Sequence, residues 1–379
     1  MTLVICRGVS ENEREALIAC LRTNLISNEK NDLMPHNPER YQKQLLFADW
    51  DAEAQQKLQA STVLLCGCGA LGTVIAETLV RAGVGTLRIV DRDFVELSNL
   101  QRQVLFDETD IESQLPKAVA ATEKLRKINS SVTIEPHVAD IDYKNIAQFA
   151  EGVDLILDGS DNFEVRFLIN DYSLEAKIPW IYGGVIGSHG QTMTIFPHET
   201  ACLRCLIERV PEPGSVETCD TAGVLGPAVN VVSSLECVAA MKVLGGKREA
   251  IEPVLTIVDV WDGTLRKMNM KSLRERGDCP ACHKGERLWL DGREGSQTVV
   301  LCGRNAVQVS PPAGFKMNLE EMSRRLETSG KVTQNRFLLR LKLNDSDHEI
   351  TLFPDGRAII KGTDEVSEAR TLYARYIGS

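Results

Sequence analysis

Short apolar runs alternate with longer stretches of helical periodicity between residues 63 and 196. The runs that we interpret as strands are VLLC (63–66), LRIV (87–90), VTIEPHV (132–138), LILD (155–158), WIYGG (180–184) and QTMTIF (191–196). Strands separated by helices are typical of β-α-β units, whose strands lie parallel. The pattern therefore predicts an α/β fold with a Rossmann-like, doubly wound and mostly parallel sheet.

The pattern changes on both sides of this region. Residues 1–38 end in the Asn-, Pro- and charge-rich stretch NEKNDLMPHNPER, and we expect them to form an N-terminal appendage. A main domain is predicted over 39–283, with an apolar helix at 228–244 after a Pro/Gly-rich loop. Beyond it, SQTVVLCG, FLLRLKL and EITLFPDGRAIIKG read as strands and SEARTLYARYIG as a helix, which predicts a small C-terminal α+β extension over 284–379.

Charge and hydropathy exclude some classes of partner. The chain has 43 Lys and Arg residues and 53 Asp and Glu residues, which gives a net charge of −10. This charge disfavours nonspecific electrostatic binding to nucleic acid or to an anionic membrane. No apolar run reaches the length of about 18 residues that a membrane span needs, and charges come too early for a signal peptide. We expect a cytoplasmic protein without a nucleic-acid or membrane partner.

A glycine-rich turn follows the first predicted strand. Gly67, Gly69 and Gly72 form a G-x-G-x-x-G motif that opens a helix, so that backbone N–H groups can approach a phosphate. Asp91 ends the next strand, where an acidic side chain reaches a ribose hydroxyl. These residues predict a nucleotide site and by themselves would favour NAD or FAD over a turn that merely packs strand on helix.

Further charged residues change the predicted nucleotide. Asp93, Asn99, Arg102 and Lys117 follow the second strand, and Asp161 follows LILD at the carboxyl edge of the sheet. A dehydrogenase does not need these cations, whereas a triphosphate needs Arg and Lys to neutralise the departing pyrophosphate. A carboxylate at the position of Asp161 can hold Mg²⁺ on the phosphates. The set therefore favours ATP with Mg²⁺.

Two C-x-x-C pairs predict a metal site. Four thiolates from Cys202, Cys205, Cys279 and Cys282 suit tetrahedral Zn²⁺, and a closed set of four leaves no position for catalytic water. We therefore expect a structural zinc ion that clamps the long insertion between the pairs. Reduced free thiols or a redox pair are the alternative.

The string DRDFVELSNLQRQ, with GCGALG before it and DGSDN after it, resembles the ThiF/MoeB/HesA family, bacterial relatives of ubiquitin-activating enzymes. The likeness runs from about Arg40 to Cys282 and is nearest to the thiamin-type sulfur-carrier adenylyltransferases. It implies ATP-dependent adenylation of the terminal Gly-Gly carboxylate of a ubiquitin-like sulfur carrier of the thiamin or molybdopterin kind. It also implies roles for site residues: Asp91 on the ribose, Asn99, Arg102 and Lys117 on the phosphates, Asp161 on magnesium, and Asp93 in support of the same pocket.

The resemblance also implies partners. In the family a basic residue of a second subunit covers ATP, from a motif matched here by Arg40 and Lys43, so a homodimer is expected. Lys43 stands where the family has a second arginine, and the motif leaves open which of the two reaches the nucleotide. Cys219 stands where relatives carry a cysteine that forms a thioester or acyl-disulfide with the carrier. A cysteine desulfurase or sulfurtransferase is the further partner this implies.

Two other functions share part of this pattern. Relatives that tailor ribosomal peptides of the microcin or pantocin kind use the same core with an N-terminal peptide clamp, for which about 38 residues would be short. A non-catalytic scaffold that binds nucleotide or carrier would be expected to lack the nucleotide residues, all of which are present here. The sequence therefore favours the sulfur-carrier adenylyltransferase.

Overall fold

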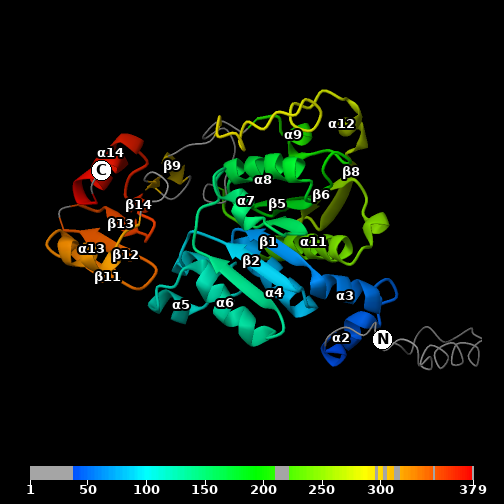
Figure 1. Ribbon diagram of the computed structural model, residues 1–379, viewed down its shortest axis with the longest axis horizontal. Coiled ribbons are helices and arrows are strands. Elements are labelled where there is room, and N and C mark those ends of the chain that lie inside the picture. The colour runs from blue at the N-terminus through cyan, green and yellow to red at the C-terminus, as the bar shows by residue number, and fades with distance from the viewer. Residues whose placement is uncertain are drawn as a thin grey trace, which may run out of the picture.

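The chain builds two β-sheets that lie side by side (Figure 1). The computed structural model describes residues 37–209, 222–294, 298–301, 305–310, 316–344 and 346–377. The first sheet has the strand order β3-β2-β1-β4-β5-β6-β7-β8, and the second has the order β11-β12-β13-β14-β10-β9. Residues 1–36, which make up nearly all of the expected N-terminal appendage, and Cys219 lie outside the described residues.

The first sheet has a parallel half and an antiparallel half. The parallel strands are β1 (Thr62–Cys66), β2 (Thr86–Val90), β3 (Thr133–His137), β4 (Leu155–Asp158) and β5 (Trp180–Ile186). The antiparallel strands are β6 (His189–Ile195), β7 (Val254–Asp259) and β8 (Thr264–Asn269). The predicted strands are confirmed, but β7 and β8 were not foreseen. Every residue of β8 is exposed, so its sequence carries no alternation of apolar and polar positions.

Helices cover both faces of this sheet, as a doubly wound fold requires. On one face, Val63 and Leu65 of β1 contribute to a core that includes α4 (Ala70–Ala82), α6 (Lys117–Ile128) and α11 (Gly226–Leu244). On the other face, Leu64 and Cys66 contribute to a core that includes α7 (Ile146–Phe149), α8 (Phe163–Ala176) and α9 (Leu203–Leu206). Helix α11 has the length and composition of a membrane span, but it packs on α4, β5 and β6 as a core helix. The shorter elements are α2 (Pro38–Leu45), α3 (Ala52–Ala60), η2 (Leu97–Asn99), α5 (Glu108–Glu112), η3 (Arg248–Ala250) and α12 (Lys271–Glu275).

Residues 298–377 form a smaller unit, which we name the C-terminal module. Its antiparallel sheet contains β9 (Thr298–Leu301), β10 (Ala306–Val309), β11 (Gly330–Gln334), β12 (Leu339–Leu343), β13 (Glu349–Leu352) and β14 (Ala358–Lys361). Helices α13 (Leu319–Leu326) and α14 (Val366–Tyr376) share a hydrophobic core with it. Just before the module, the Trp289 ring lies 5.4 Å from Phe167 of α8, so residues next to the predicted boundary at 283 pack on the first unit.

The module docks on loops that follow β2 and β3. Phe94 and Val138 of the first unit pack with Leu338, Phe353 and Ile359 of the module. The side-chain amide of Asn335 donates to the Gln114 carbonyl at 2.7 Å, and Lys361 pairs with Glu96. The C-terminal module therefore lies against the carboxyl edge of the parallel strands.

Candidate functional site

The glycine-rich turn joins β1 to α4 at the carboxyl edge of the sheet. Gly67 has φ of 95°, and a Cβ on it would lie 2.7 Å from the Gly159 carbonyl. A Cβ on Gly72 would lie 2.1 Å from the Gly67 carbonyl, so the turn closes only without side chains at these positions. A Cβ on Gly69 would lie 3.9 Å from its nearest neighbours, an ordinary van der Waals contact, so this position is not closed by a clash. This geometry suits the close approach of a phosphate.

Asp91 is held at the end of β2 by the turn itself. Its carboxylate accepts hydrogen bonds from the backbone N–H of Cys68 at 2.6 Å and of Asp93 at 2.7 Å. Burial raises the pKa of Asp91, and the nearby Lys117 ammonium opposes that effect. Each carboxylate oxygen has a further lone pair, so Asp91 can still accept a hydrogen bond from a hydroxyl. Cys66 and Cys68 are fully buried, as small fillers.

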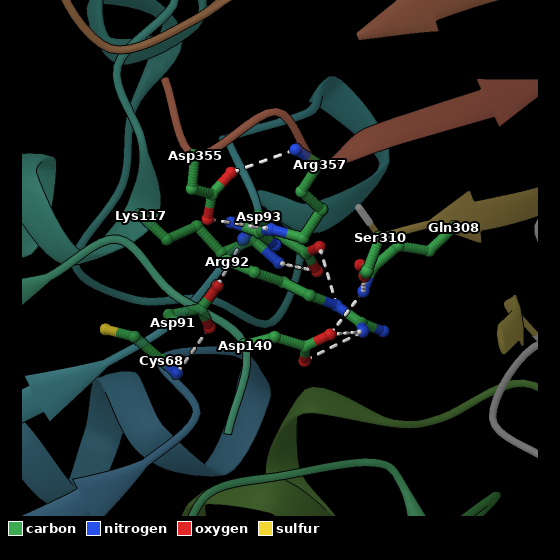
Figure 2. Close-up of polar contacts among 10 residues, drawn as sticks. All are labelled: Cys68, Asp91, Arg92, Asp93, Lys117, Asp140, Gln308, Ser310, Asp355 and Arg357. Carbon is green, nitrogen blue, oxygen red and sulfur yellow. Dashed lines mark hydrogen bonds and ion pairs between the residues drawn. The ribbon is translucent and has the colours of Figure 1, made fainter. Parts of the chain in front are cut away.

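The predicted phosphate residues all follow β2. Lys117 begins α6 and is 2 % exposed, with its Nζ 3.2 Å from the Asp93 carboxylate (Figure 2). Asn99 lies in η2 and accepts a hydrogen bond from the Glu96 N–H. Arg102, three residues after Asn99, is half-buried and donates to the Ser98 carbonyl at 2.8 Å. The structure thus brings Asp91, Asp93 and Lys117 into one cluster and places Asn99 and Arg102 on the adjoining segment.

Asp161 lies on the loop after β4 and is exposed. An ion pair that was not predicted holds this loop in place. Arg166 Nε donates to the Asp158 carboxylate at 2.8 Å. The Arg166 guanidinium also donates to the carbonyls of Ser160 at 2.7 Å and Gly183 at 2.9 Å. An acid at the end of a buried strand, followed eight residues later by an arginine, was the signal available.

A second unforeseen pair lies beside Asp91. Arg92 donates from Nη1 to both carboxylate oxygens of Asp140, at 2.9 and 3.0 Å, and its Nε lies 3.7 Å from Asp93. Asp140 follows β3, so this pair joins the ends of β2 and β3 (Figure 2). Arg92 and Asp140 are distant in sequence, and no motif links them.

Arg40 and Lys43 lie away from this cluster. They are exposed on α2, and Arg40 donates to the Ile128 carbonyl at 3.1 Å. Tyr41 between them packs against Gly83, which caps the C-terminus of α4, whereas the glycine-rich turn opens the N-terminus of that helix. A helix of 13 residues is about 20 Å long. The structure therefore does not bring Arg40 or Lys43 to the nucleotide residues of the same chain.

The four predicted cysteine ligands come together on one side of the first sheet. Their sulfur atoms all lie within 4.8 Å of one another, with pairs at 3.8 Å (Cys202 to Cys205), 3.7 Å (Cys202 to Cys279) and 3.5 Å (Cys205 to Cys282). A tetrahedron of sulfurs at about 2.3 Å from Zn²⁺ has edges of about 3.8 Å. Hydrogen bonding among the thiols lowers the pKa of Cys279 and Cys282, whereas the pKa of Cys202 and of Cys205 is raised, so the fit to a metal rests on the spacing of the sulfur atoms. The cluster fits a four-coordinate metal ion.

Comparisons with known proteins show what the chain is similar to. The ThiF family profile matches residues 41–281. The chain is 40% identical over 340 residues to the sulfur carrier protein ThiS adenylyltransferase of Bacillus subtilis, covering 89% of this chain and 99% of that protein. It is 37% identical over 247 residues to the SAMP-activating enzyme E1 of Haloferax volcanii, covering 65% of this chain and 89% of the other.

Among solved structures, the chain resembles E. coli MccB in complex with MccA-N7isoAsn. The TM-score is 0.57 at 23% sequence identity, over 73% of this chain and 82% of the other. At this level of identity the likeness concerns the fold alone.

Proposed function

The chain belongs to the ThiF family and is an adenylyltransferase, and from this premise we propose that its substrate is the C-terminal carboxylate of a ubiquitin-like sulfur carrier. The observation that carries the proposal is the 40% identity to a ThiS adenylyltransferase over nearly the whole of both chains. That match includes the C-terminal module, because it covers 89% of this chain, whereas the family profile ends at residue 281. The thiamin-type carrier is therefore favoured over the molybdopterin type.

The proposed reaction forms an acyl-adenylate. A carboxylate oxygen of the carrier bonds to the α-phosphorus of ATP, and the bond from that phosphorus to the bridging oxygen breaks. Pyrophosphate leaves with the bonding electrons, and the carrier keeps AMP on its terminal carboxyl group. The protein contributes positioning and charge neutralisation, because no enzyme group needs to bond covalently in this step.

The arrangement at the carboxyl edge supports a role for each residue. The turn of Gly67, Gly69 and Gly72 would receive phosphate, and Asp91 would accept from a ribose hydroxyl. Asn99, Arg102 and Lys117 would hold the phosphates and pyrophosphate, with Asp93 keeping the Lys117 ammonium in place. Asp161 would hold Mg²⁺, which supplies charge neutralisation at the phosphate oxygens when bound.

Two further features belong to the proposal. The cysteine cluster would hold a structural Zn²⁺, because four thiolates fill its coordination sphere. Cys219, outside the described residues, would act after adenylation as the thiol that forms a covalent link to the carrier, with a cysteine desulfurase or sulfurtransferase as sulfur donor. We expect the cytoplasm as the compartment.

The position of α2 supports a homodimer with shared active sites. Arg40 and Lys43 lie too far from their own nucleotide site, so they would complete the site of a second subunit. Apolar side chains exposed on α11 and on the nearby β5 to β8 region would supply the interface: Ile186, Leu225, Val231, Val238, Trp261, Leu265 and Met268.

The experiment that tests the function is ATP/pyrophosphate exchange by the purified full-length protein with Mg²⁺. We expect exchange that requires a Gly-Gly-ended carrier, with Asp161→Ala lowering the rate by at least about 100-fold. The Asp161→Ala protein should keep its unfolding temperature and its metal content, because the side chain is exposed. Wild-type exchange by this variant would contradict the role proposed for Asp161.

The substrate is tested in the same assay by adding short peptides in place of the carrier. Exchange with a peptide alone would move the protein to the peptide-tailoring enzymes, whose fold it shares. Binding of MgATP without exchange with any carrier or peptide would favour the scaffold.

A further inference from the structure

The C-terminal module presents one face of its sheet to the cluster of Asp91, Asp93 and Lys117, which we name the nucleotide cluster. A small cavity lies between the two units, lined by Asp93, Asn99 and Lys117 on one side and by Ala306, Ile359 and Lys361 on the other. The register of β10 and β14 pairs Ala306 with Lys361 and Gln308 with Ile359, in an antiparallel ladder. Because side chains alternate along a strand, Gln308 lies on the same face as Ala306, and Arg357 on the same face as Ile359 and Lys361.

Arg357 is the most unusual residue of this face. It is 3 % exposed, yet Nε, Nη1 and Nη2 have no hydrogen-bond partner among the residues that the structure describes. Its Nε lies 3.5 Å from the Asp355 carboxylate as an ion pair, and its guanidinium stacks at 4.2 Å over the Phe353 ring. Figure 2 shows its side chain extending from the module toward Arg92, Asp93 and Lys117. A buried guanidinium with unused donors is costly unless a ligand accepts from it.

Gln308 completes the polar part of this face. Its amide nitrogen donates to Asp140, and its amide oxygen has no partner among the described residues. Burial acts to raise the pKa of Asp140, but Arg92 and Arg357 beside it hold that pKa below the usual range. The module therefore brings an unused acceptor and unused donors to the ends of β2 and β3.

The sheet order indicates which part of a nucleotide this face meets. The phosphate turn follows β1, Asp91 follows β2 and Asp140 follows β3, and these strands are neighbours in the order β3-β2-β1. A nucleotide with its phosphates at the turn and its ribose at Asp91 therefore directs its base toward Asp140. The edge of a base and the ribose hydroxyls offer both acceptors and donors for Arg357 and Gln308.

We propose that the C-terminal module forms one wall of the nucleotide site, and that Arg357 binds the nucleoside half of ATP. This inference rests on the proposed function, since it assigns a further residue to the same site. It gives the module a part in ATP recognition within its own chain, in contrast to Arg40 and Lys43, which would act on the second subunit.

Calorimetric titration of the full-length protein with MgATP, AMP and magnesium tripolyphosphate tests this proposal without a carrier. In Arg357→Met we expect the dissociation constants of MgATP and AMP to rise at least about tenfold, since hydrogen bonds from a charged donor are lost. Tripolyphosphate, which lacks base and ribose, should bind as to the unaltered protein. Arg357→Lys keeps the charge and most of the stem, so it should fold even where methionine is not tolerated, and should show a smaller loss.

Two variants serve as matched controls. Arg324→Met removes an exposed arginine from α13 of the same module and should change no dissociation constant. Asn335→Ala removes the docking hydrogen bond to Gln114 and the two hydrogen bonds that Asn335 accepts from the Phe337 and Leu338 N–H groups, but it leaves Arg357 in place and should leave MgATP binding within about twofold of the unaltered protein.

The outcomes separate the inference from the proposed function. Unchanged MgATP binding by Arg357→Met, or equal loss of tripolyphosphate binding, would overturn the role of Arg357. Failure of the unaltered protein to bind MgATP would instead contradict the proposed function itself.

Discussion

Gly72 illustrates a position where the backbone of the site excludes any side chain. A methyl group there would lie 2.1 Å from the Gly67 carbonyl, inside the turn that would receive phosphate. The clash is with backbone, so relief requires the strand-turn-helix connection to move. The absence of a side chain at Gly72 is therefore needed both for the packing of the turn and for the proposed phosphate site.

We expect Gly72→Ala to lower the free energy of unfolding by about 2–3 kcal/mol, because overpacking moves the turn. MgATP binding should fall with it. Gly152→Ala is the matched control: its φ is 68° and no atom lies within 4 Å of the added methyl, so only the backbone conformation costs, about 1 kcal/mol. Urea unfolding and MgATP titration measure both effects, and equal behaviour of the two variants would contradict the steric explanation.

We expect Asp171 of α8 to make the stability of the protein depend on pH. Burial raises its pKa from 3.8 to about 6, although it accepts a hydrogen bond from the Trp289 N–H at 3.0 Å. Because the folded pKa is the higher one, the folded protein binds more protons than the unfolded chain between these values. The contribution of Asp171 is therefore complete below the unfolded pKa and is lost as the pH rises through the folded pKa.

Asp171→Asn cannot titrate and should remove this dependence. The free energy of unfolding of the variant, relative to the unaltered protein, should rise by at most about 3 kcal/mol between about pH 4 and about pH 7. Urea unfolding at several pH values measures the difference. Parallel stability curves for the two proteins would show that Asp171 titrates normally.

At the scale of elements, the cysteine cluster ties α9 to the segment after α12. Cys202 and Cys205 flank and enter α9, a helix of 4 residues, and α12 has 5, so neither is long enough to be stable by itself. Arg274 of α12 adds a contact from Nη1 to the Cys282 sulfur at 2.9 Å. The cluster thus adds to the hydrophobic packing of Leu203 of α9 and Leu273 of α12.

The proposed zinc site predicts that Cys279→Ser reduces the zinc content from one ion per chain to a small fraction, and lowers the free energy of unfolding by about 3 kcal/mol or more. Cys237→Ala is the control, since Cys237 is buried in α11 outside the cluster and should keep the metal. Metal analysis and thermal unfolding give the two readouts. A Cys279→Ser protein with full zinc content would exclude the four-cysteine site.

At the scale of the whole molecule, one chain has the residues proposed to bind the nucleotide at one end of α4, and Arg40 and Lys43 lie beyond the other end. A single chain is therefore incomplete if both sets act on ATP. Closure of two sites by exchange of α2 regions across a twofold axis would complete both.

This arrangement predicts complementation between two inactive variants. The double variant Arg40→Ala/Lys43→Ala and the variant Asp161→Ala should each lose pyrophosphate exchange. After mixing and subunit exchange, half of the dimers carry one intact site, so activity should return to about a quarter of that of the unaltered protein. Light scattering checks the dimer, and a mixture without recovered activity would show that Arg40 and Lys43 act within their own chain or not at all.

Local signals in the sequence were enough to predict the secondary structure and the main motifs of this protein. The parallel strands were predicted correctly, and the glycine turn, Asp91 at the end of β2 and the four clustered cysteines lie where the local motifs placed them, because strand, turn and ligand spacing are properties of short segments. The small α+β extension was likewise predicted, from its alternating runs. Each of these features depends on residues close together in the chain, or on motifs whose halves are recognisable separately.

Only the tertiary structure decided what those segments meet. The exposed strand β8, the pair of Arg92 with Asp140, and the approach of Arg357 to the nucleotide cluster have no local signal. From the sequence alone, an arginine in a turn is expected to be exposed to solvent. Whether it is buried and paired depends on neighbours that are distant in sequence. The sequence alone determined the nucleotide and metal motifs, and the packing of two sheets decided which further side chains face them.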